Sequence, residues 1–502
     1  KIADVPWAFY FSNPYDPMVG IGPRHPAQLY EALSYLTIFI FLITYYYKRF
    51  EKLVLGELFS FFLILVFGVR FFIEFLKEDQ VGFEAGMISS SSIPVGFLEP
   101  SSSGPLNGLR VIDLSRLVAG NMLTLQLGDF GADVIKVESA GSGDTLRQWR
   151  ETHPDYPKGL DGWWQTYARN KRSLALDLRN QEAMVWLKKL IDSAQVLVES
   201  FKPGTLENMG LKPDDLHATN PSLVIVRLSG WGQTGPYREL PGFGSLIEGF
   251  SGFAHKHRNA SGVPQLPNLA MADMITGLTG AFATLAAVRE VETRGGKGQV
   301  IDLSLLEPML AIMGPDVSNY AATGVETEPG KKIASPRGSY RCKDGLWVSM
   351  SGSTDTMAKR VFEAIGLAAL YEDPKFKTND ARIANDKELD QLVSNFMAAL
   401  NQADCLEHFR KHGVTVGPIY NSEQLLNDEH IKQRGIYVQL EKTHNQKAVV
   451  MHQVTPRLNS TPGKIRRAAP RLGEHTHEIL QALGSIPQEI EALTKVEGIA
   501  CK

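Results

Sequence analysis

The sequence predicts an α/β protein built on a doubly wound parallel sheet, with two transmembrane helices ahead of it. From residue 106 onward, short apolar runs alternate with amphipathic helical patterns, which is the rhythm of βαβ units. Before residue 83 the chain is far more apolar than the remainder. The length of 502 residues predicts several domains.

The N-terminal part contains two apolar runs, residues 32–47 and residues 53–76. A membrane helix needs about 20 apolar residues. The first run ends in tyrosines followed by basic residues, which are typical of the membrane–water interface. The second run contains Arg70 and Glu74, which lie one helical turn apart and can pair. These runs predict membrane contact through residues 32–76; the alternative is a buried amphipathic hairpin of a soluble protein.

The sequences around these runs, PRHPAQLYEA at residues 23–32 and VRFFIEFLKEDQ at residues 69–80, resemble the C-terminal end of a bacterial prolipoprotein diacylglyceryl transferase. The family's earlier membrane helices and their His-Gly-Gly motif have no counterpart here, and its Tyr four positions before the Arg is Val66. The resemblance implies that residues 1–83 are a truncated tail, which serves as an anchor or is a scar of gene fusion. A Ser/Pro/Gly-rich linker, residues 84–105, follows.

The predicted sheet is formed by short apolar runs that suit buried parallel strands, at residues 109–115, 132–138, 173–178, 196–199 and 223–228. Residues 298–306 predict a further strand that runs into a helix. In such sheets ligands bind at the carboxyl ends of the strands. The loops at these ends are rich in Gly and carry Arg or Lys, but none is a P-loop or a clean dinucleotide fingerprint. They predict a phosphorylated ligand held by scattered basic residues and backbone amides.

A long helix is predicted within residues 268–289, which read NLAMADMITGLTGAFATLAAVR. Small residues recur three or four positions apart on one face of this helix, so that another backbone can approach closely: Gly277, Gly280, Ala281 and Thr284. Asp273 lies at the start of the helix, where the positive end of the helix dipole favours an ionised carboxylate. From this stretch alone, Asp273 is either a helix cap or a functional carboxylate.

The loops and strands together resemble the class III CoA-transferases, a family that includes formyl-CoA transferase and carnitine CoA-transferase. The motifs include ARNKRSLALDLR, VLVESFKPGTLENMGL, LSGWGQTGPY and ADMITG, and the similarity covers residues 106–483. It implies a Rossmann-like large domain, residues 106–325 and 425–498, and a smaller α+β domain, residues 326–424. It also implies an interlocked homodimer, whose catalytic part is cytoplasmic and anchored to the bacterial inner membrane by the N-terminal stretch.

The resemblance also implies site residues. The nucleophile of the family corresponds to Asp273. The positions that hold coenzyme A correspond to Val118, Ala119, Leu176, Asp177, Leu178, Arg179, Ser200, Phe201 and Lys202. Formyl-CoA transferase has His and Gln where this chain has Arg116 and Val118, so oxalate and formate are not the expected acyl partners.

The implied reaction moves coenzyme A from an acyl-CoA donor to a carboxylic acid through anhydride and aspartyl-CoA intermediates on Asp273. No permanently bound cofactor or metal is expected, because the substrate itself is a coenzyme A thioester. A net charge of −3 gives no reason to expect nucleic acid. Two alternatives remain open: an acyl-CoA racemase using His255 or His257 with the aspartate, and a lipid-transfer remnant with an inert soluble tail.

Overall fold

The structure is a computed structural model that describes residues 9–10, 23–24, 27–49, 62, 65, 104–149, 161–259, 261–326, 332–440 and 448–490. The chain divides into two compact units, Lys1–Ser92 and Ile93–Lys502. The predicted boundaries at residues 83, 105, 325 and 424 stay predictions.

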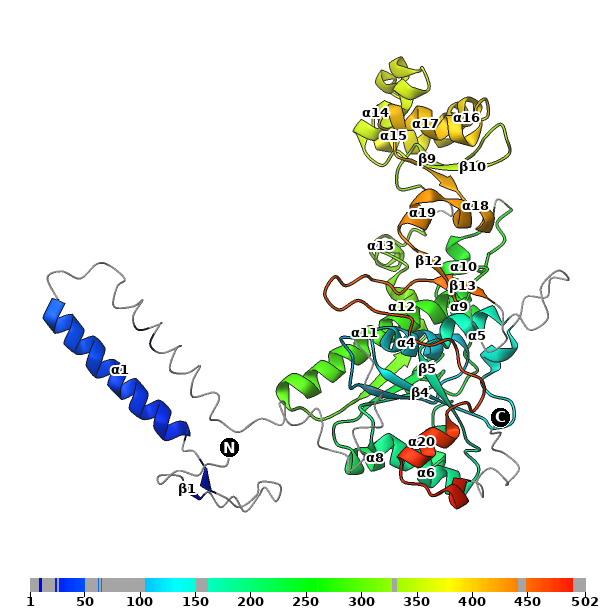
Figure 1. The fold of residues 1–502 in the computed structure, drawn as a ribbon. Coiled ribbons are helices and arrows are strands. Elements are labelled where there is room, and N and C mark those ends of the chain that lie inside the picture. Colours follow the sequence, from blue (N-terminus) through cyan, green and yellow to red (C-terminus); the bar gives the residue numbers. More distant parts are fainter. Residues whose placement is uncertain are drawn as a thin grey trace. The chain divides into compact units, whose positions relative to one another are not determined.

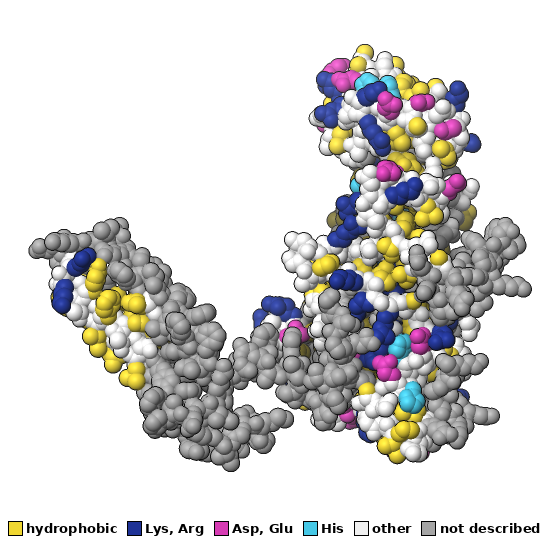
Figure 2. Space-filling model, in the orientation of Figure 1, with side chains coloured by type: hydrophobic (Ala, Val, Ile, Leu, Met, Phe, Trp, Pro, Cys, Tyr) yellow, Lys and Arg dark blue, Asp and Glu magenta, His cyan; other side chains and the backbone are white. Residues whose placement is uncertain are grey.

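The first unit contains two short paired strands and helix α1, with bounds Phe9–Tyr10 (β1), Pro23–Arg24 (β2) and Ala27–Arg49 (α1). The first apolar run is therefore helical. The second run lies outside the described residues, apart from Phe62 and Leu65, which are helical. Exposed apolar side chains lie along α1, and the basic residues Lys48 and Arg49 lie in its last turn (Figure 2).

Two transmembrane helices at the N-terminus are not supported by the structure. Among the described residues, the helix that is long and apolar enough to span a membrane is α11, Met271–Arg294, in the second unit. Many of its small and apolar residues are buried against other elements. Length and hydropathy alone do not distinguish such a core helix from a membrane helix.

The second unit contains a six-stranded parallel sheet in the order β5-β4-β3-β6-β7-β8. This is the strand order of a doubly wound, Rossmann-like sheet, so the predicted α/β class is confirmed. The strands are β3 (Arg110–Asp113), β4 (Asp133–Glu138), β5 (Lys171–Ala175), β6 (Val196–Glu199), β7 (Val224–Ser229) and β8 (Val300–Ser304).

Successive side chains of each strand are buried on opposite faces of the sheet, as the period of two requires. In β7, Val224 and Val226 contribute to one apolar cluster and Ile225 to the other. The first cluster includes residues of α4 (Leu117–Asp129), α9 (Gly244–Phe250) and α11. The second includes residues of α6 (Gln181–Asp192), α7 (Thr205–Asn208), α8 (Pro213–Thr219) and α20 (Thr476–Ala482), which lie across the sheet from α4 and α11 (Figure 1).

Shorter helical elements complete the described part around this sheet: η3 (Thr145–Gln148), α5 (Gly162–Tyr167), α10 (Phe253–Lys256), α12 (Leu306–Ala311) and α13 (Asp316–Thr323).

The third predicted strand is displaced in the structure. We expected residues 173–178, whereas β5 spans Lys171–Ala175. Lys171 and Arg172 belong to the strand because carboxylates of neighbouring strands partner them: Lys171 Nζ lies 3.3 Å from Asp113 Oδ2, and Arg172 Nη2 lies 2.6 Å from Asp133 Oδ2. Charged residues interrupt an apolar pattern, so the sequence predicted a first strand residue that lies too far along the chain.

Residues 332–440 contain a three-stranded antiparallel sheet in the order β11-β10-β9. Its strands are β9 (Arg337–Arg341), β10 (Trp347–Ser351) and β11 (Val416–Ile419), and β9 and β10 form a hairpin. The helical elements are α14 (Asp355–Ala364), η4 (Ala368–Glu372), α15 (Asn379–Ala384), α16 (Asp386–Met397), α17 (Gln402–Lys411), α18 (Ser422–Asn427) and α19 (Glu429–Gln433). A second antiparallel hairpin joins β12 (Tyr437–Leu440) to β13 (Val449–His452).

Candidate active site

A cavity of about 370 Å³ opens at the carboxyl ends of the parallel strands. It receives residues from the loops after β3, β6, β7 and β8. The chain runs outward in opposite directions from the adjacent strands β3 and β6, which makes this edge the switch point of the sheet. Ligands of doubly wound proteins bind at such a point, so this cavity is the candidate active site.

Asp273 is the one carboxylate among the described residues that line the cavity. It lies in the first turn of α11, whose N-cap residue is Ala270. The structure therefore places Asp273 inside the helix and not at its cap. The backbone N–H groups of Asp273 itself and of Ala119, at the start of α4, act on its carboxylate and favour the ionised form, which lowers its pKa.

The small residues of α11 allow it to pack closely against α4. A Cβ atom at Gly277 would lie 2.6 Å from Met122 Cβ, and one at Gly280 would lie 2.6 Å from Leu123 Cδ1. Real Cβ atoms do not approach that closely, so both positions require glycine. The predicted small-residue face is confirmed, and it brings the starts of two helices to one carboxylate.

Helix α9 covers the other side of Asp273. A Cβ atom at Gly244 would lie 2.2 Å from Asp273 Oδ2, so the missing side chain makes room for the carboxylate. One turn later, the buried Glu248 accepts a hydrogen bond of 3.1 Å from the backbone N–H of Ala272. Glu248 thereby satisfies a free amide at the start of α11.

The environment raises the pKa of Asp273 to about 6. Burial is the largest cause because it removes water from the charged form, and the negative charge of Glu248 adds to it. The two backbone amides act in the opposite direction. The carboxylate is therefore ionised at neutral pH but desolvated, which is how a protein makes a carboxylate nucleophilic.

The structure brings together about half of the residues expected at the site. Asp273, Ala119, Ser200, Phe201 and Lys202 line the cavity. The other five expected residues are not among its lining residues: Val118, Leu176, Asp177, Leu178 and Arg179.

Two of these five, Val118 and Leu176, are fully buried, so the structure presents neither of them to a ligand. Arg179 has a side chain that is 90% exposed and pairs with Asp177 at 2.9 Å. The assignment of all five to coenzyme A stays a prediction.

Two amides of the loop after β7 are already engaged in hydrogen bonds within the fold. The N–H of Gly232 donates to Ser229 Oγ at 3.0 Å, and that of Gln233 donates to Asp302 at 3.0 Å. Gly230 of this loop lines the cavity. A Cβ at Gly230 would lie 2.4 Å from Gly242 Cα, so this turn tolerates no side chain.

Sequence reasoning missed Gly244 and Glu248, and it noted Arg116 only as a difference from formyl-CoA transferase. The signal for Glu248 was a single acid within the otherwise apolar segment GSLIEGF. The sequence cannot show that this segment folds onto Asp273, which lies 25 residues further along the chain.

The histidines considered for a racemase lie elsewhere. No histidine is among the described residues that line the cavity. His255 is exposed and contacts Arg258 at 3.0 Å, and the ring of His257 stacks on Phe253 with a centroid distance of 4.0 Å. Within the described ranges, no group of three or more His, Cys, Asp or Glu residues could hold a metal ion.

Comparison with known proteins agrees with this geometry. The succinyl-CoA–D-citramalate CoA-transferase of Chloroflexus aurantiacus is 34% identical over 402 residues, which cover 79% of this chain and 98% of the relative. The succinate–glutarate CoA-transferase of Agrobacterium fabrum is 32% identical over 77% of this chain and 98% of the relative. A CAIB/BAIF family protein from Brucella suis has a crystal structure that matches with a TM-score of 0.67 and 31% identity, over 76% of this chain and all of that one.

Family models match both parts of the chain. Residues 1–98 match the model described as prolipoprotein diacylglyceryl transferase. Residues 106–476 match the model described as CoA-transferase family III. The second match and the named relatives exclude the reading of the larger part as an inert tail. The chain is an enzyme of CoA-transferase family III.

Proposed function

We propose that the enzyme moves coenzyme A from an acyl-CoA donor to a carboxylic acid, with Asp273 as the nucleophile. The observation that carries this proposal is the position of Asp273. It is the one acid among the described lining residues of the cavity, and it has a pKa of about 6 and two helix-start amides on its carboxylate. Covalent catalysis by a carboxylate keeps the energy of the thioester, because the acyl group passes only between activated forms.

The proposed steps balance without any net proton transfer. A carboxylate oxygen of Asp273 attacks the thioester carbon of the donor, which releases coenzyme A thiolate and leaves a mixed anhydride. The thiolate attacks the aspartyl carbon, which releases the donor acid and forms an aspartyl-CoA thioester. The acceptor carboxylate attacks the aspartyl-CoA thioester, which releases coenzyme A thiolate and forms a second mixed anhydride. The thiolate then attacks the acyl carbon of the acceptor, which forms the new acyl-CoA and restores the carboxylate of Asp273. The amide of Ala119 and that of Gly230 are the proposed donors to the oxyanions.

The donor we propose is succinyl-CoA, with a short dicarboxylic acid as acceptor. The names of the relatives support this choice, since they act on succinyl-CoA with D-citramalate or L-malate and on succinate with glutarate. A matrix of acyl-CoA donors and acid acceptors, read by mass spectrometry, tests it. We expect transfer from succinyl-CoA to at least one of these dicarboxylic acids. Transfer confined to monocarboxylic acids would contradict the assignment.

Activity is expected to fall as pH decreases through about 6, because the attacking form of Asp273 is the ionised one and its pKa is raised to that value. Glu248→Gln removes the neighbouring charge but keeps an acceptor for the Ala272 amide. The acid limb of kcat/KM should therefore move to lower pH. Glu290→Gln, on the exposed face of α11, is the matched control and should leave the limb unchanged. An unmoved limb in Glu248→Gln would show that this charge does not act on Asp273.

We also propose that the N-terminal part attaches an interlocked homodimer to a membrane. The exposed apolar side chains of α1 and the family match of residues 1–98 support the attachment. A chain that begins at Met87 should remain dimeric in sedimentation, keep its kcat/KM and lose binding to anionic vesicles, whereas the full chain binds them. Aggregation or inactivity of the shorter chain would contradict the proposal that the two parts fold independently.

A further inference from the structure

The cavity carries more positive than negative charge. Arg116, Lys202 and Arg238 line it, against the single carboxylate of Asp273. Arg238 is paired with Glu239 at 3.0 Å. The resemblance to the family assigns Lys202 to coenzyme A. Arg116 is exposed and has no carboxylate within ion-pair distance among the described residues, so its charge is available to a ligand.

We infer that Arg116 binds the remote carboxylate of a dicarboxylic acyl group and thereby selects dicarboxylic over monocarboxylic acids. This inference rests on the proposed function. One carboxyl group of the substrate must react at Asp273, so only a second one can meet Arg116. Most other lining residues are apolar, among them Phe201, Leu240 and Phe243. A remote carboxylate that enters such a cavity loses water and needs a cation in return.

The backbone at Arg116 is fixed before any ligand arrives. Its N–H donates to Ser200 Oγ at 2.9 Å, which joins the loop after β3 to the loop after β6. The next residue, Leu117, has a φ of 62°, a left-handed conformation that is unfavourable for leucine. The N–H of Leu117 donates to Asp144 Oδ1 at 2.9 Å, which holds the strained turn in place.

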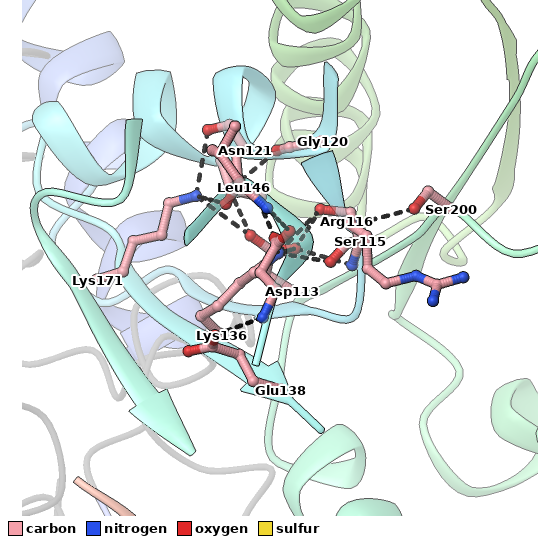
Figure 3. Close-up of polar contacts among 12 residues, drawn as sticks. Asp113, Ser115, Arg116, Gly120, Asn121, Lys136, Glu138, Leu146, Lys171 and Ser200 are labelled. Carbon is pink, nitrogen blue, oxygen red and sulfur yellow. Dashed lines mark hydrogen bonds and ion pairs between the residues drawn. The ribbon is translucent and has the colours of Figure 1, made fainter. Parts of the chain in front are cut away.

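A buried ion-pair network anchors this turn to the sheet (Figure 3). Lys136 Nζ lies 3.0 Å from Asp144 Oδ2 and 3.2 Å from Asp113 Oδ1, and all three side chains are inaccessible or nearly so. Lys136 also donates to the carbonyl oxygen of Ser115, directly before Arg116. In Figure 3 the guanidinium of Arg116 extends away from this network and makes none of the drawn contacts.

A guanidinium in such a position suits a carboxylate better than it suits a neutral group. Its planar fork can donate two parallel hydrogen bonds to one carboxylate, and it stays charged at every physiological pH. Because the backbone of Arg116 is already fixed, only its side chain must be ordered when the ligand binds. The fixed backbone also means that a substitution of the side chain changes the ligand contact and not the turn.

The test compares succinyl-CoA with butyryl-CoA, which has the same chain length but no remote carboxylate. In Arg116→Gln we expect kcat/KM for succinyl-CoA to fall by about 10- to 100-fold, the usual loss for a charge-assisted hydrogen bond. The value for butyryl-CoA should change by less than about threefold, since no contact is removed from it. Arg116→Lys should fall between Arg116→Gln and the wild type, because lysine keeps the charge but not the fork.

Arg238→Gln is the matched control, since Arg238 lines the same cavity but is already paired. Its ratio of succinyl-CoA to butyryl-CoA activity should stay close to that of the wild type. An equal loss with both donors in Arg116→Gln, or a ratio that collapses in Arg238→Gln instead, would overturn the inference. Failure of the wild type to use either donor with any acid would overturn the proposed function itself.

Discussion

Asp273→Asn is expected to lower CoA transfer by about 10⁴-fold or more, because an amide cannot attack a thioester and the covalent route is lost. The substitution keeps the size of the side chain, so the contacts with α4 and α9 remain. Incorporation of labelled succinate into succinyl-CoA measures the loss. Hydroxylamine added with acyl-CoA should modify Asp273 in the wild type and leave the Asn variant unmodified.

The same variant is expected to unfold at a higher temperature. The pKa of Asp273 is raised from 3.8 to about 6, so the folded state disfavours its charge, and stability decreases as pH rises from the first value through the second. Each pKa unit corresponds to about 1.4 kcal/mol, which gives a gain on the order of 3 kcal/mol for the neutral amide at pH 7.5. Asp214→Asn, at an exposed carboxylate of α8, is the control and should change neither activity nor stability. Undiminished turnover of Asp273→Asn would refute the nucleophile.

Gly244→Ala is expected to lower kcat by about 100-fold, since a displacement of about 1 Å at a reacting group has an effect of this size. The added Cβ would lie 2.2 Å from Asp273 Oδ2, so the carboxylate must move away from the amide of Ala119. The residue is the first of helix α9 and has no positive φ, so alanine suits its backbone.

The control for this prediction lies on the same helix. A Cβ at Gly249 has no atom within 4 Å, so Gly249→Ala should retain nearly full activity. Both variants should have circular dichroism spectra like that of the wild type. If the two alanines lowered kcat equally, the close approach of Gly244 to Asp273 would not be the cause.

Most of the sheet could be predicted from the sequence because its strands bury apolar residues on both faces. Val196–Glu199 was placed without error, and the neighbouring strand differs by one residue at each end. The exception was β5, where Lys171 and Arg172 are buried with acids from other strands. Burial of a paired charge depends on a partner far away in the sequence, and no local pattern reveals it.

The site residues that belong to a recognisable sequence motif could be predicted from the sequence. Asp273 and the loop from Ser200 to Lys202 follow from recognisable segments and line the cavity. Glu248 and Gly244 act on Asp273 only because α9 packs against the start of α11. Their influence depends on distances across two elements, which become visible only when the chain is folded.

The buried network beneath the cavity also determines how the enzyme can be observed. The pKa of Asp113 is lowered to about 2 by its lysine partners, although burial opposes them, and that of Lys171 is lowered to about 8 by burial. Both groups therefore keep their charges between about pH 3 and pH 7. Asp273 titrates inside this interval, while Asp113 and Lys171 of the buried network behind Arg116 keep their charges. A titration followed by infrared absorption of carboxylates should consequently contain no signal from Asp113 in the interval in which Asp273 takes up its proton.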